Sequence, residues 1–426
     1  MDKERLKFVL QETEELKEPH LFQRDLVIPL GSGKIVVLVG IRRSGKTFLL
    51  HDIQQRLIAG GVDRRQIIRL SFEDDRLHPI KPEEFDLILQ AHAELYPDLA
   101  GKPRTFLFDE VQSAPGWERF VRRLQDTQAG EVYLTGSSSQ LLSSEIATGL
   151  RGRCLSYEVF PLSFGEFLRF QGQEAEYYTT EGEGRLAAAL DDYLHIGGLP
   201  EVVLADASLR PRILREYLDL VFYRDLVERH KVGNPEVLKE ILRYCMGNPA
   251  SLFNPHKLYQ DMRSRGYSLG KDTIYKYIHF LEEAYLLYLA PLCDPSIRKQ
   301  AINPKKMHPV DWSVGLVYRP GKMIDMGRRL ETAVYLHHRR KGATLSYLGG
   351  PAEIDLVAET PAGVHWVNTA WSLTDDDTWR REELAIRRTG QPDTRTLVVR
   401  EAANRQAPTG VTIINAWRFL LGVCRA

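Results

Sequence analysis

The stretch VLVGIRRSGKTFLL, residues 37–50, decides the fold of the first part of the chain. A valine-rich run ends at Gly40, and a helical pattern begins near Thr47. Between them, Gly40-x-x-x-x-Gly45-Lys46-Thr47 matches a phosphate-binding loop. Glycines let the backbone of such a loop curl until successive N–H groups point at one anion, and the next helix adds its positive N-terminus. The stretch therefore predicts a strand, a nucleotide-binding loop and a helix.

The loop pattern predicts what its side chains do. We expect Lys46 to reach the β- and γ-phosphates and the Thr47 hydroxyl to bind Mg²⁺. Arg42 and Arg43 would lie around the nucleotide's negative charge or against a neighbouring protein surface. Because the sequence has no NKxD-like pattern for reading guanine, ATP is favoured over GTP. The expected nucleotide contacts are Gly40, Ile41, Arg42, Arg43, Ser44, Gly45, Lys46, Thr47 and Phe48.

Two further strands end in polar residues that fit this chemistry. TFLFDEV, residues 105–111, contains Asp109 and Glu110. Asp109 would hold the Mg²⁺ shell, and Glu110 would act as the general base that orients a water. Alone, an acidic pair after a buried strand is also ordinary loop chemistry. LTGSSS, residues 134–139, places Ser137 where it would sense the γ-phosphate or the water, or would cap a helix.

Composition sets the class of protein. The chain has 426 residues, 43% hydrophobic and 27% charged, which suggests about two to four globular domains. Lys+Arg and Asp+Glu both total 57, so nucleic-acid binding would require a local basic patch. The N-terminus has no apolar signal region, and no apolar run approaches the roughly 18 residues of a membrane span. The four cysteines are far apart, which indicates thiols in a reducing cytoplasm rather than zinc or disulfides.

The pattern of elements changes along the chain. Apolar runs at 34–40, 66–72, 105–111, 131–137 and 154–160 alternate with helices beginning near Thr47, Lys81 and Trp117, which predicts a parallel α/β sheet. Residues 161–247 indicate only helices. Residues 248–318 indicate a helix-turn-helix followed by a wing. The rest predicts a second α/β unit, with a helix at 328–341 and three following strands.

Five segments in this order carry a family resemblance: GIRRSGKTFLL, FLFDEVQ, LTGSSSQLLSSEIATGLRGR, VFPLSFGEF and YLHIGGLPEVV. Together they resemble a large family of prokaryotic AAA-type ATPases of the AAA+ superfamily with a C-terminal domain of restriction-endonuclease-like, PD-(D/E)xK, fold. The resemblance implies four domains. These are an AAA+-like core at 1–165, a helical lid at 166–247, a winged helix-turn-helix at 248–320 and an endonuclease-like domain at 321–426.

The resemblance also draws attention to GLRGR, residues 149–153. Arg151 or Arg153, with Arg153 favoured, could reach a γ-phosphate as an arginine finger, and a finger that acts in trans implies a homo-oligomer. A solvated basic turn or an internal salt bridge is the alternative.

The predicted winged helix has a mixed surface. Its recognition helix offers Lys271, Lys276 and His279 to a DNA groove but also carries acidic residues, so protein docking is the alternative. Further basic residues would contact phosphates or simply be solvated: Arg263, Arg265, Arg298, Lys299, Lys305 and Lys306.

Whether the protein could be a nuclease depends on the residues of the last domain. The resemblance implies acids at Glu331, Glu353 and Asp355, followed by an acid-x-Lys or Gln-x-Lys pattern on the next strand. Asn368 and Ala370 occupy those places, so the lysine is missing and cleavage is not expected. His337 and His338 are interpreted as an exposed helix face rather than a metal-binding pair.

The sequence thus predicts a cytoplasmic, Mg²⁺-dependent ATP hydrolase that uses ATP to change conformation on a DNA or protein partner. Two alternatives stay open. One is a metal-dependent nuclease regulated by ATP, and the other is a nucleotide-gated interaction module with little turnover.

Overall fold

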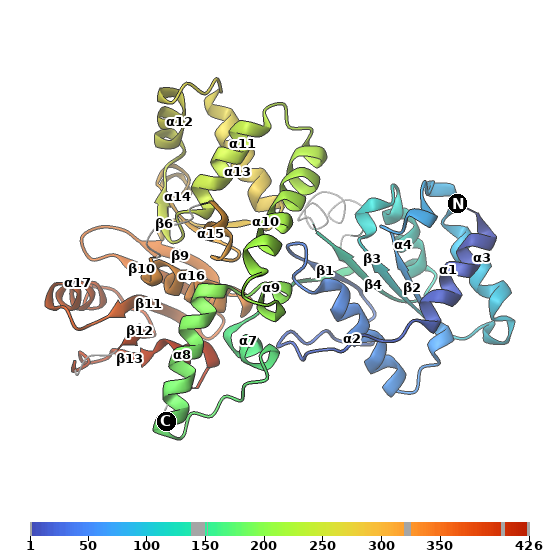
Figure 1. Cartoon of the computed structure of the whole chain (residues 1–426), viewed down its shortest axis with the longest axis horizontal. Coiled ribbons are helices and arrows are strands. Elements are labelled where there is room, and N and C mark those ends of the chain that lie inside the picture. The colour runs from blue at the N-terminus through green and yellow to red at the C-terminus, as the bar shows by residue number, and fades with distance from the viewer. Residues whose placement is uncertain (1, 138–149, 151, 319–324, 402–404, 424–426) are drawn as a thin grey trace. The chain divides into compact units, whose positions relative to one another are not determined.

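The computed structural model describes residues 2–137, 150, 152–318, 325–401 and 405–423. The chain divides into two compact units, Met1–Val159 and Phe160–Ala426 (Figure 1). The second unit contains everything after residue 159, so this division does not test the boundaries of the four predicted domains. Those boundaries stay a prediction. No helix in the described part of the chain is both long and apolar enough to cross a membrane.

The first unit is built on a five-stranded parallel sheet, which confirms the prediction of parallel α/β structure. Its strand order is β2-β3-β4-β1-β5. The strands are β1 Ile35–Val39, β2 Ile67–Ser71, β3 Arg104–Asp109, β4 Gly130–Gly136 and β5 Cys154–Glu158. The helices are α1 Lys3–Glu15, α2 Lys46–Ala59, α3 Asp86–Leu95 and α4 Trp117–Asp126. The second predicted helix start, near Lys81, is a short 3-10 turn, and α3 begins five residues after Lys81.

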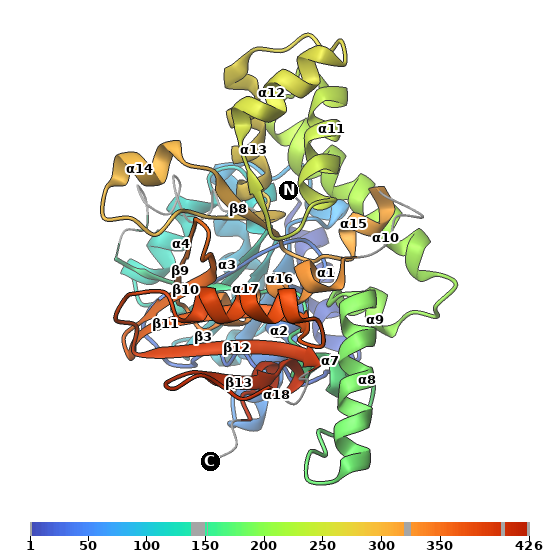
Figure 2. The same cartoon turned by 90° about the vertical axis from the view of Figure 1, so that its left-hand side faces the viewer.

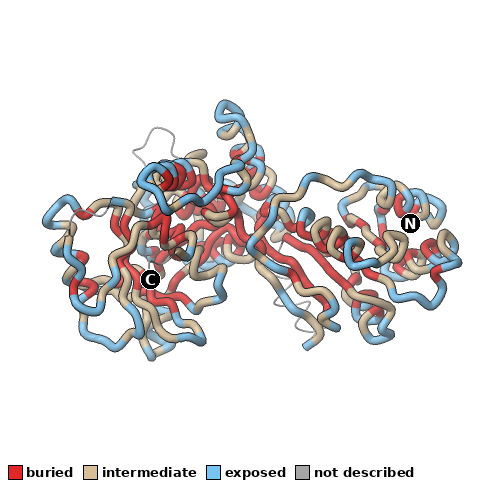
Figure 3. The backbone as a smooth tube through the Cα atoms, turned by 90° about the horizontal axis from the view of Figure 1, so that it is seen from below, coloured by how far each residue is buried: buried red, intermediate tan, exposed pale blue. Residues whose placement is uncertain are grey.

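Both faces of the central strands β1, β3 and β4 are buried, which explains their long apolar runs. On one face, Leu49 and Ile53 of α2 pack with Val36 and Leu38 of β1 and with Leu107 of β3. On the other face an aromatic cluster forms, with the ring of Phe108 5.4 Å from Phe72 and 6.1 Å from Phe120. In Figure 3 the buried residues follow the central strands. Since all strands are parallel, their carboxyl ends meet at one edge.

The second unit begins with helices, as predicted. They are α7 Phe164–Phe170, α8 Thr180–Ile196, α9 Pro200–Leu204, α10 Arg210–Leu220, which continues into the π-helix Val221–Glu228, and α11 Pro235–Met246. A three-stranded antiparallel sheet of order β6-β8-β7 follows. Its region contains β6 Ser251–Phe253, α12 Pro255–Ser264, α13 Lys271–Glu283, β7 Leu287–Ala290, α14 Ile297–Ile302, β8 Lys305–Pro309 and α15 Val314–Tyr318.

The chain ends in a second five-stranded sheet, β13-β12-β11-β10-β9, which combines antiparallel and parallel pairs. Figure 2 shows α17 lying along this sheet. The predicted helix and three strands are α16 Met326–Arg340, β9 Thr344–Leu348, β10 Ile354–Thr360 and β11 Gly363–Ser372. The sequence analysis had not assigned α17 Asp376–Ile386, β12 Thr394–Glu401, β13 Thr412–Asn415 and α18 Ala416–Leu421.

The GGLP segment has a structural role in the second unit. The backbone N–H of Gly198 donates to Asp311 Oδ2 at 2.6 Å, and the N–H of Leu162 donates to Gly198 O at 2.6 Å. A Cβ atom on Gly198 would come within 2.6 Å of Leu162 O. Glycine at 198 therefore lets three segments meet at one point.

Candidate functional site

The loop after β1 has the backbone of an anion site. Gly40, Arg43 and Gly45 have φ angles of 137°, 58° and 101°. A Cβ atom on Gly40 would lie 2.4 Å from Val159 O, so only glycine fits where the loop passes the end of β5. Helix α2 begins at Lys46 and has no side-chain cap, which leaves its first N–H groups for another acceptor.

The side chains of the loop agree with this use. Lys46 is 4% exposed, and its Nζ atom lies 3.0 Å from the carbonyl oxygens of both Gly40 and Ile41, so the ammonium group is held at the loop itself. The Ser44 hydroxyl is buried and has no hydrogen-bond partner among the described residues. These features fit a bound phosphate chain.

Asp109 lies beside the first turn of α2. The Thr47 hydroxyl donates to Asp109 Oδ2 at 2.9 Å, and the Thr135 hydroxyl donates to Asp109 Oδ1. Burial raises the pKa of Asp109, with a further contribution from Glu110, whereas Thr135, Thr47 and Lys46 act in the opposite direction. A divalent cation would relieve the cost of burying this carboxylate.

The donor set fits magnesium. A carboxylate and a hydroxyl are hard oxygen ligands, and Mg²⁺ at nucleotide sites takes one or two protein ligands with substrate phosphates and water completing its shell. No group of three or more His, Cys, Asp or Glu side chains suited to a metal occurs among the described residues. Thr47 and Asp109 would therefore hold Mg²⁺ together with a nucleotide.

Glu110 occupies a constrained backbone position at the end of β3. Its φ angle is 49°, and its N–H donates to the Thr135 hydroxyl at 2.9 Å. Its carboxylate lies 3.8 Å from Lys46 Nζ and accepts a hydrogen bond from Gln112. Burial acts to raise the pKa of Glu110, but the positive charges of Lys46 and Arg42 outweigh it and hold that pKa below its usual range. Glu110 is thus a charged acceptor beside the loop.

The structure brings most of the other predicted residues to the same edge. Ser137 accepts from Gln112 Nε2 at 3.4 Å and is buried. Arg42 pairs with Glu73 at 2.9 Å, so part of its charge is balanced within the unit. Arg43 and Phe48 are exposed, Phe48 by 55%.

Arg153 lies at the opposite edge of the sheet. It precedes β5, whose first residue pairs with Ile35, the first residue of β1. Its Nε atom donates to Asp126 Oδ1 at 3.1 Å. The internal salt bridge that the sequence allowed is therefore present, and Arg153 does not reach the loop of its own chain. Arg151 lies outside the described residues.

Sequence reasoning missed three residues at the site. Thr135 bridges Asp109 and Glu110, Gln112 connects Glu110 with Ser137, and Arg24 donates to Ser44 O at 2.8 Å. Sequence could have pointed to Thr135, because it lies two residues before Ser137 at the end of β4 and residues two apart on a strand face the same side. Arg24 gave none, since it comes from an irregular segment before β1.

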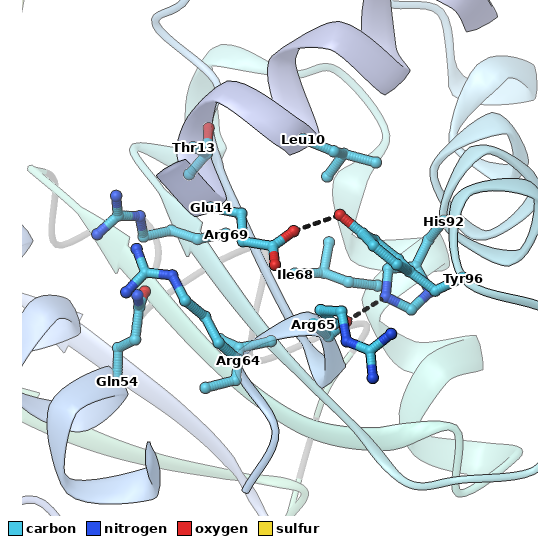
Figure 4. A pocket seen from close by; sticks show the side chains of 11 residues that line it. Leu10, Thr13, Glu14, Gln54, Arg64, Arg65, Ile68, Arg69, His92 and Tyr96 are labelled. Carbon is cyan, nitrogen blue, oxygen red and sulfur yellow. Dashed lines mark hydrogen bonds between the residues drawn. The ribbon is translucent and has the colours of Figure 1, made fainter. Parts of the chain in front are cut away.

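A small cavity of about 20 Å³ also lies in the first unit (Figure 4). Among its lining residues, the Tyr96 hydroxyl donates to Glu14, and His92 Nε2 lies 2.7 Å from Arg65 O. A space of this size holds about one water molecule. It is too small for a nucleotide or a substrate.

In the second unit the predicted acids do meet, but around an unexpected lysine. Lys306 Nζ of β8 lies 2.8 Å from Glu331, 2.6 Å from Glu353 and 3.1 Å from Asp355. The expectation that Lys306 contacts phosphates on the wing is wrong, because its side chain is 3% exposed. The cluster of Lys306, Glu331, Glu353 and Asp355 is called the β8 ion cluster below.

Two other predictions about this domain need correction. Asn368 donates to Glu382 of α17 at 3.0 Å, and Ala370 packs with Ile386 of α17, so neither position belongs to the β8 ion cluster. A lysine is therefore present among the acids, but it comes from another strand. His337 and His338 are not an exposed face, because both rings pack on Phe419, with centroids 5.2 Å and 5.6 Å away.

Two family models match parts of this chain, and solved structures show a limited similarity to it. A family model described as an AAA domain matches residues 32–168, and one for a domain of unknown function (DUF8612) matches residues 187–319. Among solved structures, the Walker-type ATPase of Pyrococcus abyssi is similar with 14% identity and a TM-score of 0.43, covering 75% of this chain and 95% of that one.

Two relatives are closer in sequence. An uncharacterized protein of Methanocaldococcus jannaschii is 35% identical over 341 residues, which is 78% of this chain and 73% of that protein. An uncharacterized protein of Haemophilus influenzae is 30% identical over 346 residues, or 80% of this chain and 84% of that protein. The chain therefore belongs to the family of these two proteins, and its residues 32–168 form an AAA domain of the kind found in P-loop ATPases.

Proposed function

We propose that this protein is a Mg²⁺-dependent ATPase. The proposal rests on one observation. At the carboxyl edge of the first sheet, beside the uncapped start of α2, the structure brings together Lys46, Thr47, Asp109 and Glu110. Lys46 and the loop N–H groups bind the phosphates, and Thr47 and Asp109 would hold Mg²⁺, which would supply charge stabilisation at the γ-phosphate. Glu110 accepts a proton from the attacking water.

The arrangement of Glu110 supports hydrolysis rather than simple binding. Its carboxylate is charged, lies beside Lys46 and is oriented by Gln112. Ser137 sits at the far end of the Gln112 side chain and would report the position of the γ-phosphate or of the water. A pure binding module would need the loop but not this oriented base.

Two substitutions test the function. Lys46→Ala should abolish ATP binding measured by calorimetry, whereas Glu110→Gln should keep binding and lower phosphate release by about 10²–10⁴-fold. Glu118→Gln, the same change on nearby α4, serves as the control and should keep wild-type turnover. Wild-type turnover by Glu110→Gln would remove Glu110 from the base role. Absence of ATP binding by the folded wild type would reject the whole proposal.

We further propose that turnover acts on a macromolecular partner through the region of α12, α13 and the β7–β8 hairpin, which we interpret as a winged helix. Ile274, Ile278 and Leu281 are buried, while Lys271, Lys276 and His279 are exposed, as the sequence predicted. The exposed face of α13 also carries Asp272, so its charge is mixed. Phosphate release with and without double-stranded DNA tests whether DNA is this partner, and an unchanged rate would favour a protein partner.

We also propose that the C-terminal domain, 321–426, is an endonuclease-like fold that does not cleave DNA. The support is that Glu331, Glu353 and Asp355 are already paired with Lys306. Incubating plasmid with the protein, Mg²⁺ or Mn²⁺ and ATP tests this directly. Cleavage that is lost in Asp355→Asn would instead establish the ATP-regulated nuclease.

A further inference from the structure

The β8 ion cluster brings four ionisable groups to one point in the second unit. Glu331 comes from α16 and Lys306 from β8, whereas Glu353 directly precedes β10 and Asp355 is the second residue of β10. The Nζ atom of Lys306 lies between 2.6 and 3.1 Å from an oxygen of each carboxylate. An ammonium group has three hydrogens and no acceptor, so its donors match the surrounding acids in number.

Lys306 is held in this position by its strand. β8 is the central strand of its sheet, and Lys306 is in register with Leu252 of β6 and with Ala290 of β7. The Nζ atom also lies 5.7 Å from the centre of the Tyr347 ring. With 3% of its side chain exposed, the lysine cannot turn towards solvent without moving the strand.

Asp355 is also fixed independently of the lysine. Asp355 Oδ2 accepts hydrogen bonds from the N–H and the hydroxyl of Thr369, at 3.0 Å and 3.2 Å. Burial and the Asp355 carboxylate raise the pKa of Glu331 to about 8, although Lys306 opposes this shift. The carboxylates are thus crowded and need a cation between them.

We propose that Lys306 is an internal counter-ion whose ammonium group fills the space between these acids, which is why the described residues offer no ready metal site there, and that replacing its charge opens this space to a divalent metal ion. Calcium binds carboxylate oxygens at 2.3–2.6 Å. The oxygens now stand at 2.6–3.1 Å from a single atom, so they need to move inward by less than about 1 Å to hold Ca²⁺. The ammonium group excludes the metal because both cations need the same place.

The test compares calcium uptake by the full chain, without nucleotide, using calorimetry. Lys306→Met keeps the apolar stem and removes the charge, and it should gain saturable Ca²⁺ binding that the double variant Lys306→Met/Glu331→Gln loses. The wild type and Glu331→Gln should give the same titration. Lys299→Met is the matched control, since Lys299 is an exposed lysine paired with a single acid, Asp294, at 3.2 Å; it should behave as the wild type.

Thermal unfolding gives a second readout. Lys306→Met should lower Tm by roughly 5 °C or more, because it leaves three partly buried acids without their cation, and Ca²⁺ should restore most of that loss. Lys306→Gln, which keeps a neutral donor, replaces Lys306→Met if the latter does not fold. The proposal is overturned if neither folded variant gains Ca²⁺ binding, or if the wild type already has a Ca²⁺ site that Glu331→Gln removes.

Discussion

The Thr135 hydroxyl joins the two acidic residues of the AAA domain, since it donates to Asp109 and accepts from the N–H of Glu110. Thr135→Val keeps the shape of the side chain but leaves both groups without this partner. We expect the turnover rate to fall by about 10- to 100-fold, with ATP affinity less affected and a stability loss of about 1–3 kcal/mol. Thr135→Ser restores the hydroxyl and should recover activity. Wild-type turnover in folded Thr135→Val would show that the bridge does not position the acids.

The residues of this site differ in how far sequence alone could find them. Lys46 and Thr47 follow from a local spacing, and Asp109 and Glu110 follow from the end of an apolar strand. Thr135 and Ser137 could not be separated from sequence, because both face the same side of β4. The register that pairs Phe108 with Leu134 decides between them and brings Thr135 beside Asp109.

At the scale of elements, the junction at Gly198 gives a direct prediction. Gly198→Ala should destabilise the protein by about 1–3 kcal/mol, because the new methyl group would meet the backbone of Leu162. Gly184→Ala is the matched control. Gly184 lies in α8 with nothing within 4 Å of its added Cβ, so alanine there should be neutral or stabilise by about 0.5–1 kcal/mol. Urea unfolding of the full chain measures both changes, and equal stabilities would show that the junction tolerates a side chain.

The raised pKa of Glu331 predicts how the stability of the second unit depends on pH. The folded state keeps the Glu331 proton up to about pH 8, while the unfolded chain loses it near its ordinary pKa of 4.5. The folded state therefore binds more protons in this window, and stability contributed by Glu331 falls as pH rises through it. Glu331→Gln should show a smaller fall in Tm between about pH 5 and pH 8, whereas Glu383→Gln, outside the β8 ion cluster, should keep the wild-type slope. Parallel Tm curves for wild type and Glu331→Gln would contradict the prediction.

The helices and strands that could be located from sequence were those whose own residues show a clear apolar pattern. The central strands β1, β3 and β4 of the first sheet are apolar runs because both of their faces are covered. The last part of the chain is harder, because charged residues dominate α17. Lys306 was misjudged because its partners come from parts of the chain that follow it in sequence. A lysine on a wing is usually exposed, and the acids that bury this one come from α16 and β10.

At the scale of the whole molecule, the position of Arg153 bears on assembly. The five residues of β1 span about 16 Å, and Arg153 and the phosphate loop lie at opposite ends of that length. If Arg153 stabilises a γ-phosphate, it must be the phosphate of another chain. Catalysis would then require a homo-oligomer, and the specific activity of the wild type should rise with protein concentration.

A mixing experiment tests this shared site directly. Arg153→Ala keeps an intact loop but lacks the finger, whereas Lys46→Ala keeps the finger but lacks a working loop. Each variant alone should be nearly inactive, and mixing them should restore turnover, because a loop from the first can meet a finger from the second. Arg122→Ala is the matched control, since Arg122 lies 3.4 Å from the same Asp126 that pairs with Arg153, and it should be active alone. If the mixture stays inactive while both proteins are folded and associate, Arg153 has only the structural pairing with Asp126, and the finger must be sought elsewhere in the chain.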